Sequence, residues 1–341
     1  MAIHNRQWLL QERPLGMVKP EHFELVETAL PQPDLKAGQV LVKTLMLGFD
    51  PAMRGWLADE PSYLPPVAIG EPMRASGVGQ VVQSENSELP VGTLVQGLLN
   101  WQEYGIGDPA GLIPPNALPA GTPPNLALSV FGSTSLTAYF GLLDVGQPAA
   151  GETVLVSGAA GATGSVVAQI ARLKGCRVVG IAGGAEKCAW LLKDCKLDAV
   201  IDYKNEDIEQ RIGELCPNGV NVFFDNVGGA TLEAGITHIA DFGRIVLCGA
   251  ISAYNDAEAK PGPRNLMVLV ARRVRMQGFI VLDYLDRAGE AIAALTEWVM
   301  AGDIIWREDI QEGFENIPTT LQRLFSGANV GKQLLKLADP E

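Results

Sequence analysis

The chain has 341 residues, of which 47% are hydrophobic, and this length exceeds what one core usually accommodates, so we expect two domains. Its 39 acidic residues outnumber its 26 basic ones and give a formal net charge of −13, which argues against non-specific binding to nucleic acid or to an anionic membrane. No apolar run approaches the ~18 residues of a spanning helix, and the first residues lack the pattern of a signal peptide, so we expect a cytoplasmic protein.

Short apolar segments interrupted by Gly and Pro occupy the chain from Val40 to about Gly105. This pattern favours a compact β-barrel or a curled sheet and excludes a helical bundle. Two proline-rich stretches, Pro61–Pro72 and Pro109–Pro124, lack N–H groups for a sheet ladder. We therefore predict that both stretches are loops.

After Phe131 the pattern changes to apolar runs that alternate with helical segments. The runs are VLVSG, RVVGIAG, AVIDY, NVFFDNV, RIVLCG and RMQGFIV. Six such runs predict a doubly wound parallel sheet whose strands are buried on both faces. Ligands of such sheets bind beyond the carboxyl ends of the strands, so we expect a cofactor across the loops that follow these runs.

The first of these runs leads into a glycine-rich turn with Gly158, Gly161 and Gly164 three residues apart. The glycines permit a tight turn and a close backbone approach, and they direct helix N–H groups at phosphate oxygens. The following helix has one apolar face, which supplies the context that a dinucleotide site requires. The alternative is a glycine-rich turn of an unrelated α/β domain.

The end of the second strand indicates which dinucleotide is bound. Enzymes that hold NAD place Asp or Glu there to bind the ribose 2′-hydroxyl, but this chain has Ala182, Gly183 and Gly184. Lys187 follows, and its cation can bind a 2′-phosphate that a carboxylate would repel, so we predict NADP(H). Tyr203 could add a hydroxyl to the same phosphate. The alternatives are a solvated lysine and a tyrosine that packs at the sheet edge.

The distribution of Cys and His argues against a metal. The first 150 residues contain no cysteine, and the three histidines have no ligand partner at suitable spacing. The five cysteines show neither metal spacing nor a disulfide framework, so we interpret most of them as small buried residues. Hydride transfer from NADPH needs no metal, provided that another group stabilises the arriving charge.

The C-terminal segment IPTTLQRLFSGANVGKQLLKL predicts a helix, a glycine turn and a last alternating strand. The six-stranded sheet is already complete before this segment. We therefore expect the tail to rejoin the first domain.

Several motifs in a fixed order carry a resemblance that extends over nearly the whole chain. They are DPAMRG (Asp50–Gly55), DEPSYLPPVAIGEPM (Asp59–Met73), LTAYFGLLDVGQP (Leu136–Pro148), the glycine-turn segment Ala159–Cys188, FDNVGG (Phe224–Gly229), CGAISAYN (Cys248–Asn255), QGFIV (Gln277–Val281) and GANVGK (Gly327–Lys332). With these motifs the chain resembles the zinc-independent medium-chain dehydrogenase/reductases, and among them the alkenal, enone and prostaglandin reductases of the curcumin-reductase type.

The resemblance implies an α/β fold in two parts and a reaction. Residues 1–130 and 306–341 would form a GroES-like β-barrel domain that binds substrate, and residues 131–305 a Rossmann domain that binds NADP. The implied activity is NADPH-dependent reduction of the carbon–carbon double bond of enones and enals, with no metal. The implied assembly is a homodimer in which the segment RMQGFIV supplies a pairing strand.

The resemblance also implies site residues, carried over motif by motif. The implied cofactor contacts are Gly161, Ala162, Thr163, Gly164, Lys187, Tyr203, Asn226, Cys248, Gly249, Ala250, Ile251, Ser252, Tyr254, Phe279, Ile280, Val281 and Asn329. Arg54 and Tyr63 are weaker candidates for lining the substrate site. One departure is FGSTSLTAYF, which stands where many relatives have a Gly-Met-Pro/Thr-Gly run, so substrate preference does not carry over from them.

Tyr254 is the candidate catalytic residue, because a hydroxyl near the carbonyl oxygen of an enone would stabilise the enolate that hydride addition creates. Its alternative is a loop tyrosine that only packs. The proton for the α-carbon can come from solvent. Two other functions stay open: an NADPH quinone reductase, and a cofactor-binding protein with a structural or sensing role.

Overall fold

The computed structural model describes residues 3–30, 33–258 and 260–341, and it divides into two compact units. Unit 1 comprises residues 1–129 and 308–341, and unit 2 comprises residues 130–307. Within the described ranges, no helix is both long and apolar enough to cross a membrane.

Unit 1 is built mainly from strands. Its strands are β1 (Ile3–Leu10), β2 (Phe23–Leu30), β3 (Val40–Phe49), β4 (Ser76–Ser84), β5 (Leu94–Leu98), β6 (Tyr104–Gly107), β7 (Asn116–Ala117), β14 (Glu308–Glu312) and β15 (Lys332–Lys336). Its helices are η1 (Pro20–His22), η2 (Pro51–Leu57), α1 (Pro124–Leu128), η5 (Phe314–Asn316) and α9 (Ile317–Ser326).

One seven-stranded sheet organises unit 1, in the order β14-β15-β3-β4-β5-β7, with β6 also paired to β3. All neighbours are antiparallel except β14 and β15. Strand β3 is buried along nearly its whole length, because it pairs with β4 and also with β15 and β6. Trp101 is fully buried against the rings of Phe23 and Phe49, with centroids 4.8 and 6.1 Å away. The predicted curled sheet is therefore confirmed as a predominantly antiparallel sheet around one core.

The C-terminal segment rejoins unit 1 as predicted, since β15 pairs with β3 after the helix α9 and the left-handed Gly327. Its strand does not alternate, however: Lys332, Gln333, Leu334 and Leu335 are all buried. The prediction of alternating buried and exposed residues was wrong, because β15 is an interior strand of the sheet, where polar side chains are also covered.

Two further expectations for unit 1 need correction. The stretch Pro109–Pro124 is not entirely a loop, because Asn116 and Ala117 form β7 against β5; these two residues carry the N–H groups that the surrounding prolines lack. The hairpin of β1 and β2, whose eight-residue strands form a separate two-stranded sheet, was not predicted.

Unit 2 alternates strands and helices. Its strands are β8 (Thr153–Ser157), β9 (Arg177–Ala182), β10 (Ala199–Asp202), β11 (Val220–Asp225), β12 (Ile239–Leu247) and β13 (Arg275–Gly278). Its helices are α2 (Ser133–Phe140), the π-helix η3 (Gly141–Gly146), α3 (Ala162–Leu173), α4 (Ala185–Lys193), α5 (Ile208–Leu215), α6 (Gly229–Thr237), α7 (Met267–Ala271), η4 (Val281–Arg287) and α8 (Ala288–Met300).

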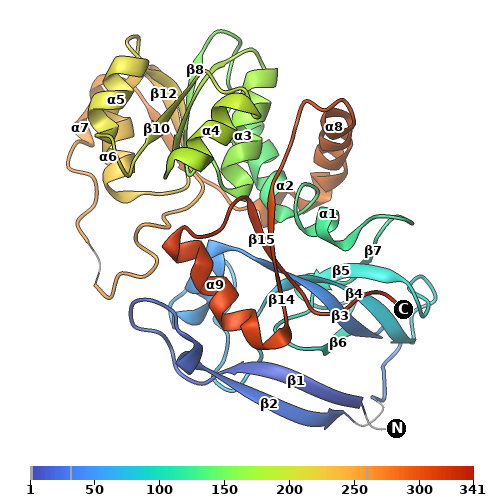
Figure 1. Ribbon diagram of the computed structural model, residues 1–341. Coiled ribbons are helices and arrows are strands. Elements are labelled where there is room, and N and C mark those ends of the chain that lie inside the picture. Colours follow the sequence, from blue (N-terminus) through green and yellow to red (C-terminus); the bar gives the residue numbers. More distant parts are fainter. Residues whose placement is uncertain (1–2, 31–32, 259) are drawn as a thin grey trace. The chain divides into compact units, whose positions relative to one another are not determined.

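The six strands form the predicted parallel sheet, in the order β10-β9-β8-β11-β12-β13. Figure 1 shows α3 and α4 on one side of this sheet and α5, α6 and α7 on the other. The strand order reverses direction between β8 and β11, and a crevice at the carboxyl ends of the strands is expected at such a point. The doubly wound fold class is thus confirmed.

The expectation that every strand is buried on both faces is wrong for β13. This strand is partly or fully exposed along its length, and it ends at Gly278, before the apolar residues Phe279, Ile280 and Val281. The reason is its position at the edge of the sheet, where only β12 pairs with it.

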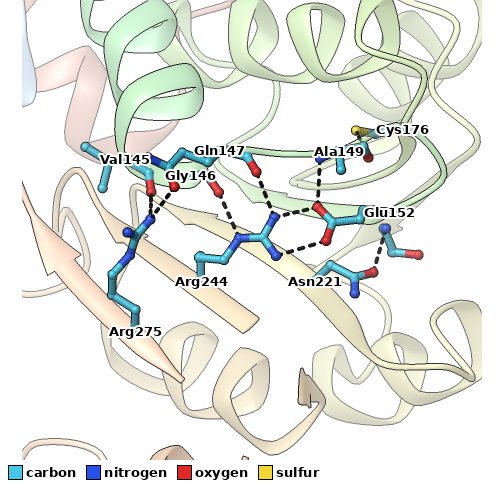
Figure 2. A network of polar contacts seen from close by, with 10 residues as sticks. Val145, Gly146, Gln147, Ala149, Glu152, Cys176, Asn221, Arg244 and Arg275 are labelled. Carbon is cyan, nitrogen blue, oxygen red and sulfur yellow. Dashed lines mark hydrogen bonds and ion pairs between the residues drawn. The ribbon is translucent and has the colours of Figure 1, made fainter. Parts of the chain in front are cut away.

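An arginine network ties the helix η3 to the amino ends of the sheet strands (Figure 2). Arg244 donates to the carbonyl oxygen of Gly146 at 3.0 Å and to the Glu152 carboxylate at 2.9 Å. Arg275 donates to the carbonyl oxygen of Val145. Because a π-helix leaves its last carbonyls without helix partners, these arginines satisfy them from β12 and β13.

Candidate functional site

The glycine turn between β8 and α3 is the first part of the candidate site. Gly158 adopts φ +59°, and Gly161 is the N-cap of α3. A Cβ atom on Gly164 would lie 2.3 Å from the carbonyl oxygen of Gly158, a distance that no side chain tolerates. The backbone of this turn therefore leaves no room for a side chain at Gly164, and α3 begins directly after the turn. This arrangement fits the pyrophosphate of a dinucleotide.

A buried polar network lies beside this turn and joins the carboxyl ends of β8 and β11. The Ser157 hydroxyl donates to the Asp225 carboxylate at 2.6 Å, and it accepts the N–H of Asn226 at 2.8 Å. The carboxylate also accepts the N–H groups of Val227 and Gly228. Asp225 is fully buried, and this burial raises its pKa despite the hydrogen bonds. The network fixes Asn226, whose side chain donates to the carbonyl oxygen of Ser157 at 2.7 Å.

The loop after β12 packs on the loop after β11. The N–H of Ser252 and its hydroxyl both donate to the carbonyl oxygen of Val227, at 3.1 and 2.7 Å. A Cβ atom on Gly228 would lie 3.1 Å from the side chain of Ala250, so the two loops are in close contact. The segment from Cys248 to Tyr254 and the segment from Asn226 to Gly229 thus form one surface.

Tyr254 lies on that surface with its hydroxyl over the end of β12. The hydroxyl oxygen accepts the N–H of Ala250 at 3.1 Å. A phenol oxygen that accepts a hydrogen bond is a better donor of its own hydrogen, because negative charge on the oxygen is stabilised. Burial raises the pKa of the nearby Cys248 thiol to about 12, which disfavours its thiolate form at neutral pH.

The other end of the candidate site is formed by β9, β10 and the start of α4. Lys187 is in the first turn of α4, whose N-cap is Gly184 with φ +96°. A Cβ atom on Gly183 would lie 2.6 Å from the ring of Tyr203, so this ring packs directly on the glycine backbone. No acidic residue ends β9. The carboxylate of Glu186 pairs with the guanidinium of Arg307 at 3.6 Å. The residues present here fit a 2′-phosphate better than a ribose hydroxyl.

Phe279 follows β13 and packs against the glycine at the start of η3. A Cβ atom on Gly141 would lie 2.3 Å from the Phe279 ring, and the ring centroid of Phe224 is 6.4 Å away. Ile280 and Val281 continue from Phe279 into η4. Their predicted role in enclosing the nicotinamide stays a prediction.

Three candidate residues lie in unit 1. Arg54 is 7% exposed and donates to the carbonyl oxygens of Pro14 and Gly16, so its side chain supports the N-terminal loop. The Tyr63 hydroxyl accepts from the indole of Trp56 at 3.2 Å and is exposed. The Asn329 side chain donates to the carbonyl oxygen of Gly331. The substrate and cofactor roles of Arg54, Tyr63 and Asn329 stay predictions.

Two acidic residues that organise these loops were not predicted from the sequence. Asp225 stands in the FDNVGG motif and Asp202 in the run AVIDY, and neither was singled out. Each is the last residue of its strand in the structure, and a carboxylate near the end of a parallel strand is the signal that could have identified both. Among the residues that the structure describes, no group of three or more His, Cys, Asp or Glu side chains is arranged to hold a metal.

Comparison with known proteins gives full-length matches. Residues 6–114 match the family described as N-terminal domain of oxidoreductase, and residues 162–297 match the family described as zinc-binding dehydrogenase. The NADPH-dependent curcumin reductase of Escherichia coli (strain K12) is 41% identical over 98% of this chain and 97% of its own length. Prostaglandin reductase 1 of Bos taurus is 40% identical over 98% of this chain and 99% of its own.

A solved structure agrees with these sequence matches. The crystal structure of CurA from Vibrio vulnificus in complex with NADPH superposes with a TM-score of 0.91 at 40% identity. The match covers 98% of this chain and all of the CurA chain. The relatives and this protein therefore share both units and the same cofactor-binding fold.

Proposed function

The chain belongs to the medium-chain dehydrogenase/reductase family of NADPH-dependent curcumin, prostaglandin and 2-alkenal reductases, and from this membership we propose that it reduces the carbon–carbon double bond of α,β-unsaturated aldehydes and ketones. The observation that carries the proposal is the surface of unit 2 on which the glycine turn, Asn226 and Tyr254 lie at the carboxyl ends of neighbouring strands. Such a surface suits a dinucleotide beside a single hydroxyl donor.

When bound, NADPH supplies a hydride for the β-carbon of the enone, and the accompanying charge collects on the carbonyl oxygen as an enolate. Tyr254 is the residue of this surface that donates a hydrogen bond to that oxygen or orders the ribose hydroxyls. The N–H of Ala250 supports the charge that the Tyr254 oxygen acquires as its hydrogen is shared.

The residues Gly161, Ala162, Thr163 and Gly164 bind the pyrophosphate in this proposal, through N–H groups at the start of α3. Lys187 and Tyr203 bind the 2′-phosphate and set the preference for NADP. Asn226 and the segment from Cys248 to Tyr254 contact the ribose and nicotinamide. Asn329 is a further predicted cofactor contact.

The protein works as a cytoplasmic homodimer in this proposal. Strand β13 is an exposed edge of the parallel sheet, and an edge strand can pair with the same strand of a second copy. Its formal net charge of −13 suits a protein with small-molecule partners rather than a nucleic-acid or membrane partner.

Anaerobic mixing of the protein with NADPH and methyl vinyl ketone tests the proposal. We expect the nicotinamide absorbance to fall while mass spectrometry detects the saturated ketone in equal amount. Bound NADPH with an unchanged alkene would refute the proposal and favour a sensing role. Rapid NADPH oxidation by a quinone, with little reaction of the enone, would instead identify a quinone reductase.

A further inference from the structure

The carboxylate of Asp202, at the end of β10, is bonded to the backbone that surrounds the predicted 2′-phosphate site. Its Oδ1 accepts the N–H of Gly184 at 2.8 Å and the N–H of Lys204 at 3.2 Å, and its Oδ2 accepts the side chain of Asn205 at 2.8 Å. These hydrogen bonds, the one from Gly184 foremost, lower the pKa of Asp202, so the carboxylate is ionised at neutral pH.

The bond to Gly184 sets the start of α4. Gly184 is the N-cap of that helix, has φ +96° and has no side chain with which to cap it. Asp202 thus provides an anchor from the neighbouring strand, beside the helix start where an anionic group is also electrostatically favourable. Lys187 is in the first turn of α4, so this anchor holds the backbone from which its side chain extends.

The Asp202 carboxylate also holds the turn that contains Tyr203, because its bond from the N–H of Lys204 spans that residue. The N–H of Tyr203 donates to the carbonyl oxygen of Ala182 at 3.1 Å, and its ring covers Gly183. Glu206 stabilises the turn after β10 as well. Its carboxylate accepts the N–H of Asp202 at 2.7 Å and pairs with Arg211 at 2.8 Å. Both predicted phosphate ligands therefore depend on one carboxylate.

We propose that Asp202 is a positioning residue that determines the preference for a 2′-phosphorylated cofactor, by holding Gly184 and the start of α4 in the arrangement that directs Lys187 and Tyr203 to the phosphate. This inference rests on the proposed function for the identity of the cofactor. Asp202 is not the counterpart of the acid of NAD enzymes, because it ends β10 rather than β9, and its oxygens accept three hydrogen bonds from the protein. The hydrogen bonds of the Asp202 carboxylate thereby stabilise the predicted phosphate site, although its negative charge alone would repel a phosphate.

Two substitutions separate the hydrogen bond from the charge. Asp202→Asn keeps an oxygen that can accept from Gly184 and removes the charge, whereas Asp202→Glu keeps the charge and displaces the oxygen by one methylene. The probes are 2′,5′-ADP and 5′-AMP, titrated by calorimetry into the full-length protein. Positioning predicts that Asp202→Glu weakens 2′,5′-ADP about tenfold and 5′-AMP less than about twofold, while Asp202→Asn changes both by less than about threefold.

The opposite pattern would overturn the inference. If the charge of Asp202 acted alone, Asp202→Asn would tighten 2′,5′-ADP and Asp202→Glu would leave it unchanged. Equal weakening of both probes would show a purely structural role. In the Lys187→Ala background, Asp202→Glu should weaken 2′,5′-ADP by less than about threefold, because one of the two ligands that Asp202 positions is gone.

Failure of the inference and failure of the proposed function give different results. If wild-type protein binds 2′,5′-ADP no more tightly than 5′-AMP, the NADP preference itself is wrong. If the wild-type preference is present and the two variants do not follow the pattern above, only the role of Asp202 is wrong.

Discussion

At the scale of single residues, the hydroxyl of Tyr254 is the group that we expect to act on the substrate. Removing one donor to a developing oxyanion typically costs about 10²- to 10³-fold in rate, so Tyr254→Phe should reduce the single-turnover rate of NADPH oxidation by about 10²-fold. The Kd for NADPH should change by less than about threefold, because the phosphate contacts lie elsewhere. Stopped-flow absorbance and a fluorescence titration measure the two quantities.

An unchanged rate in Tyr254→Phe would show that the tyrosine only packs against Ala250. A large loss of NADPH binding with an unchanged rate would place its role at the ribose instead. Both outcomes are distinguishable because the rate and the affinity are measured separately.

Lys187 gives the second prediction at this scale. Loss of one charge-assisted phosphate contact costs roughly 1.5 to 3 kcal/mol, so Lys187→Ala should weaken NADPH by that amount and leave NADH nearly unchanged. Lys193, in the last turn of the same helix, is the matched control, and Lys193→Ala should affect neither cofactor. Equal weakening of NADPH and NADH by Lys187→Ala would show that Lys187 does not recognise the phosphate.

At the scale of elements, the turn between β8 and α3 depends on the absence of a side chain at Gly164. Its Cβ would meet the carbonyl oxygen of Gly158 at 2.3 Å and the Cα of Ala159 at 2.9 Å, and both belong to the backbone. Overpacking of this kind costs about 1 to 3 kcal/mol, so Gly164→Ala should lower the unfolding free energy by at least that much and abolish NADPH binding.

The matched control for Gly164 is Gly289, which is in the first turn of α8 and has no atom within 4 Å of its Cβ position. Gly289→Ala should stabilise unit 2 by about 0.4 to 1 kcal/mol, because alanine reduces the entropy of the unfolded chain. Denaturant titration measures both variants. If the two substitutions shift stability in the same direction, the steric account of the turn is incorrect.

The elements that were predictable from sequence are those with a local signal. Five of the six parallel strands lie in apolar runs and β13 begins a sixth, and the helical segments between the runs indicate parallel pairing, whereas the strand order was not predicted. The hairpin of β1 and β2 was not predicted, because its strands do not show a regular alternation of apolar and polar residues. The interrupting polar residues include Arg6, Gln7, Glu24 and Glu27. Contacts such as Ser157 with Asp225, 68 residues apart, carry no local signal, so the network beneath Asn226 needed the structure.

At the scale of the whole molecule, the ion pair of Glu152 and Arg244 links stability to pH. Burial raises the pKa of Glu152, but the bonds from Arg244 and Ala149 outweigh burial and leave the pKa below 4.5, its ordinary value. A lowered carboxylate pKa contributes stability that is present above the unfolded pKa and is lost as the pH falls through the folded pKa.

Glu152→Gln should therefore lower the unfolding free energy by about 1 to 3 kcal/mol at pH 7, and the difference from wild type should shrink as the pH falls below about 4. Glu297→Gln, on the exposed face of α8, is the control and should change little at either pH. Thermal unfolding across the pH range checks the prediction. A difference that persists unchanged at acid pH would exclude the ion pair as its cause.

The edge of the parallel sheet at β13 is the surface through which we expect two copies of the protein to assemble. Beside β13, the short helix α7 and its N-cap expose Leu266, Met267 and Val270, at 49, 73 and 68% of their accessible surface. A two-fold axis at this edge would pair two β13 strands and bring these apolar side chains of both copies together.

Light scattering after gel filtration should then show a dimer, and Val270→Glu should shift it to monomer because the charge would be buried without a partner. Met300 is 82% exposed and ends a different helix, α8, so Met300→Glu should remain dimeric. A wild-type monomer at all concentrations, or dissociation by Met300→Glu alone, would place the interface elsewhere or remove it.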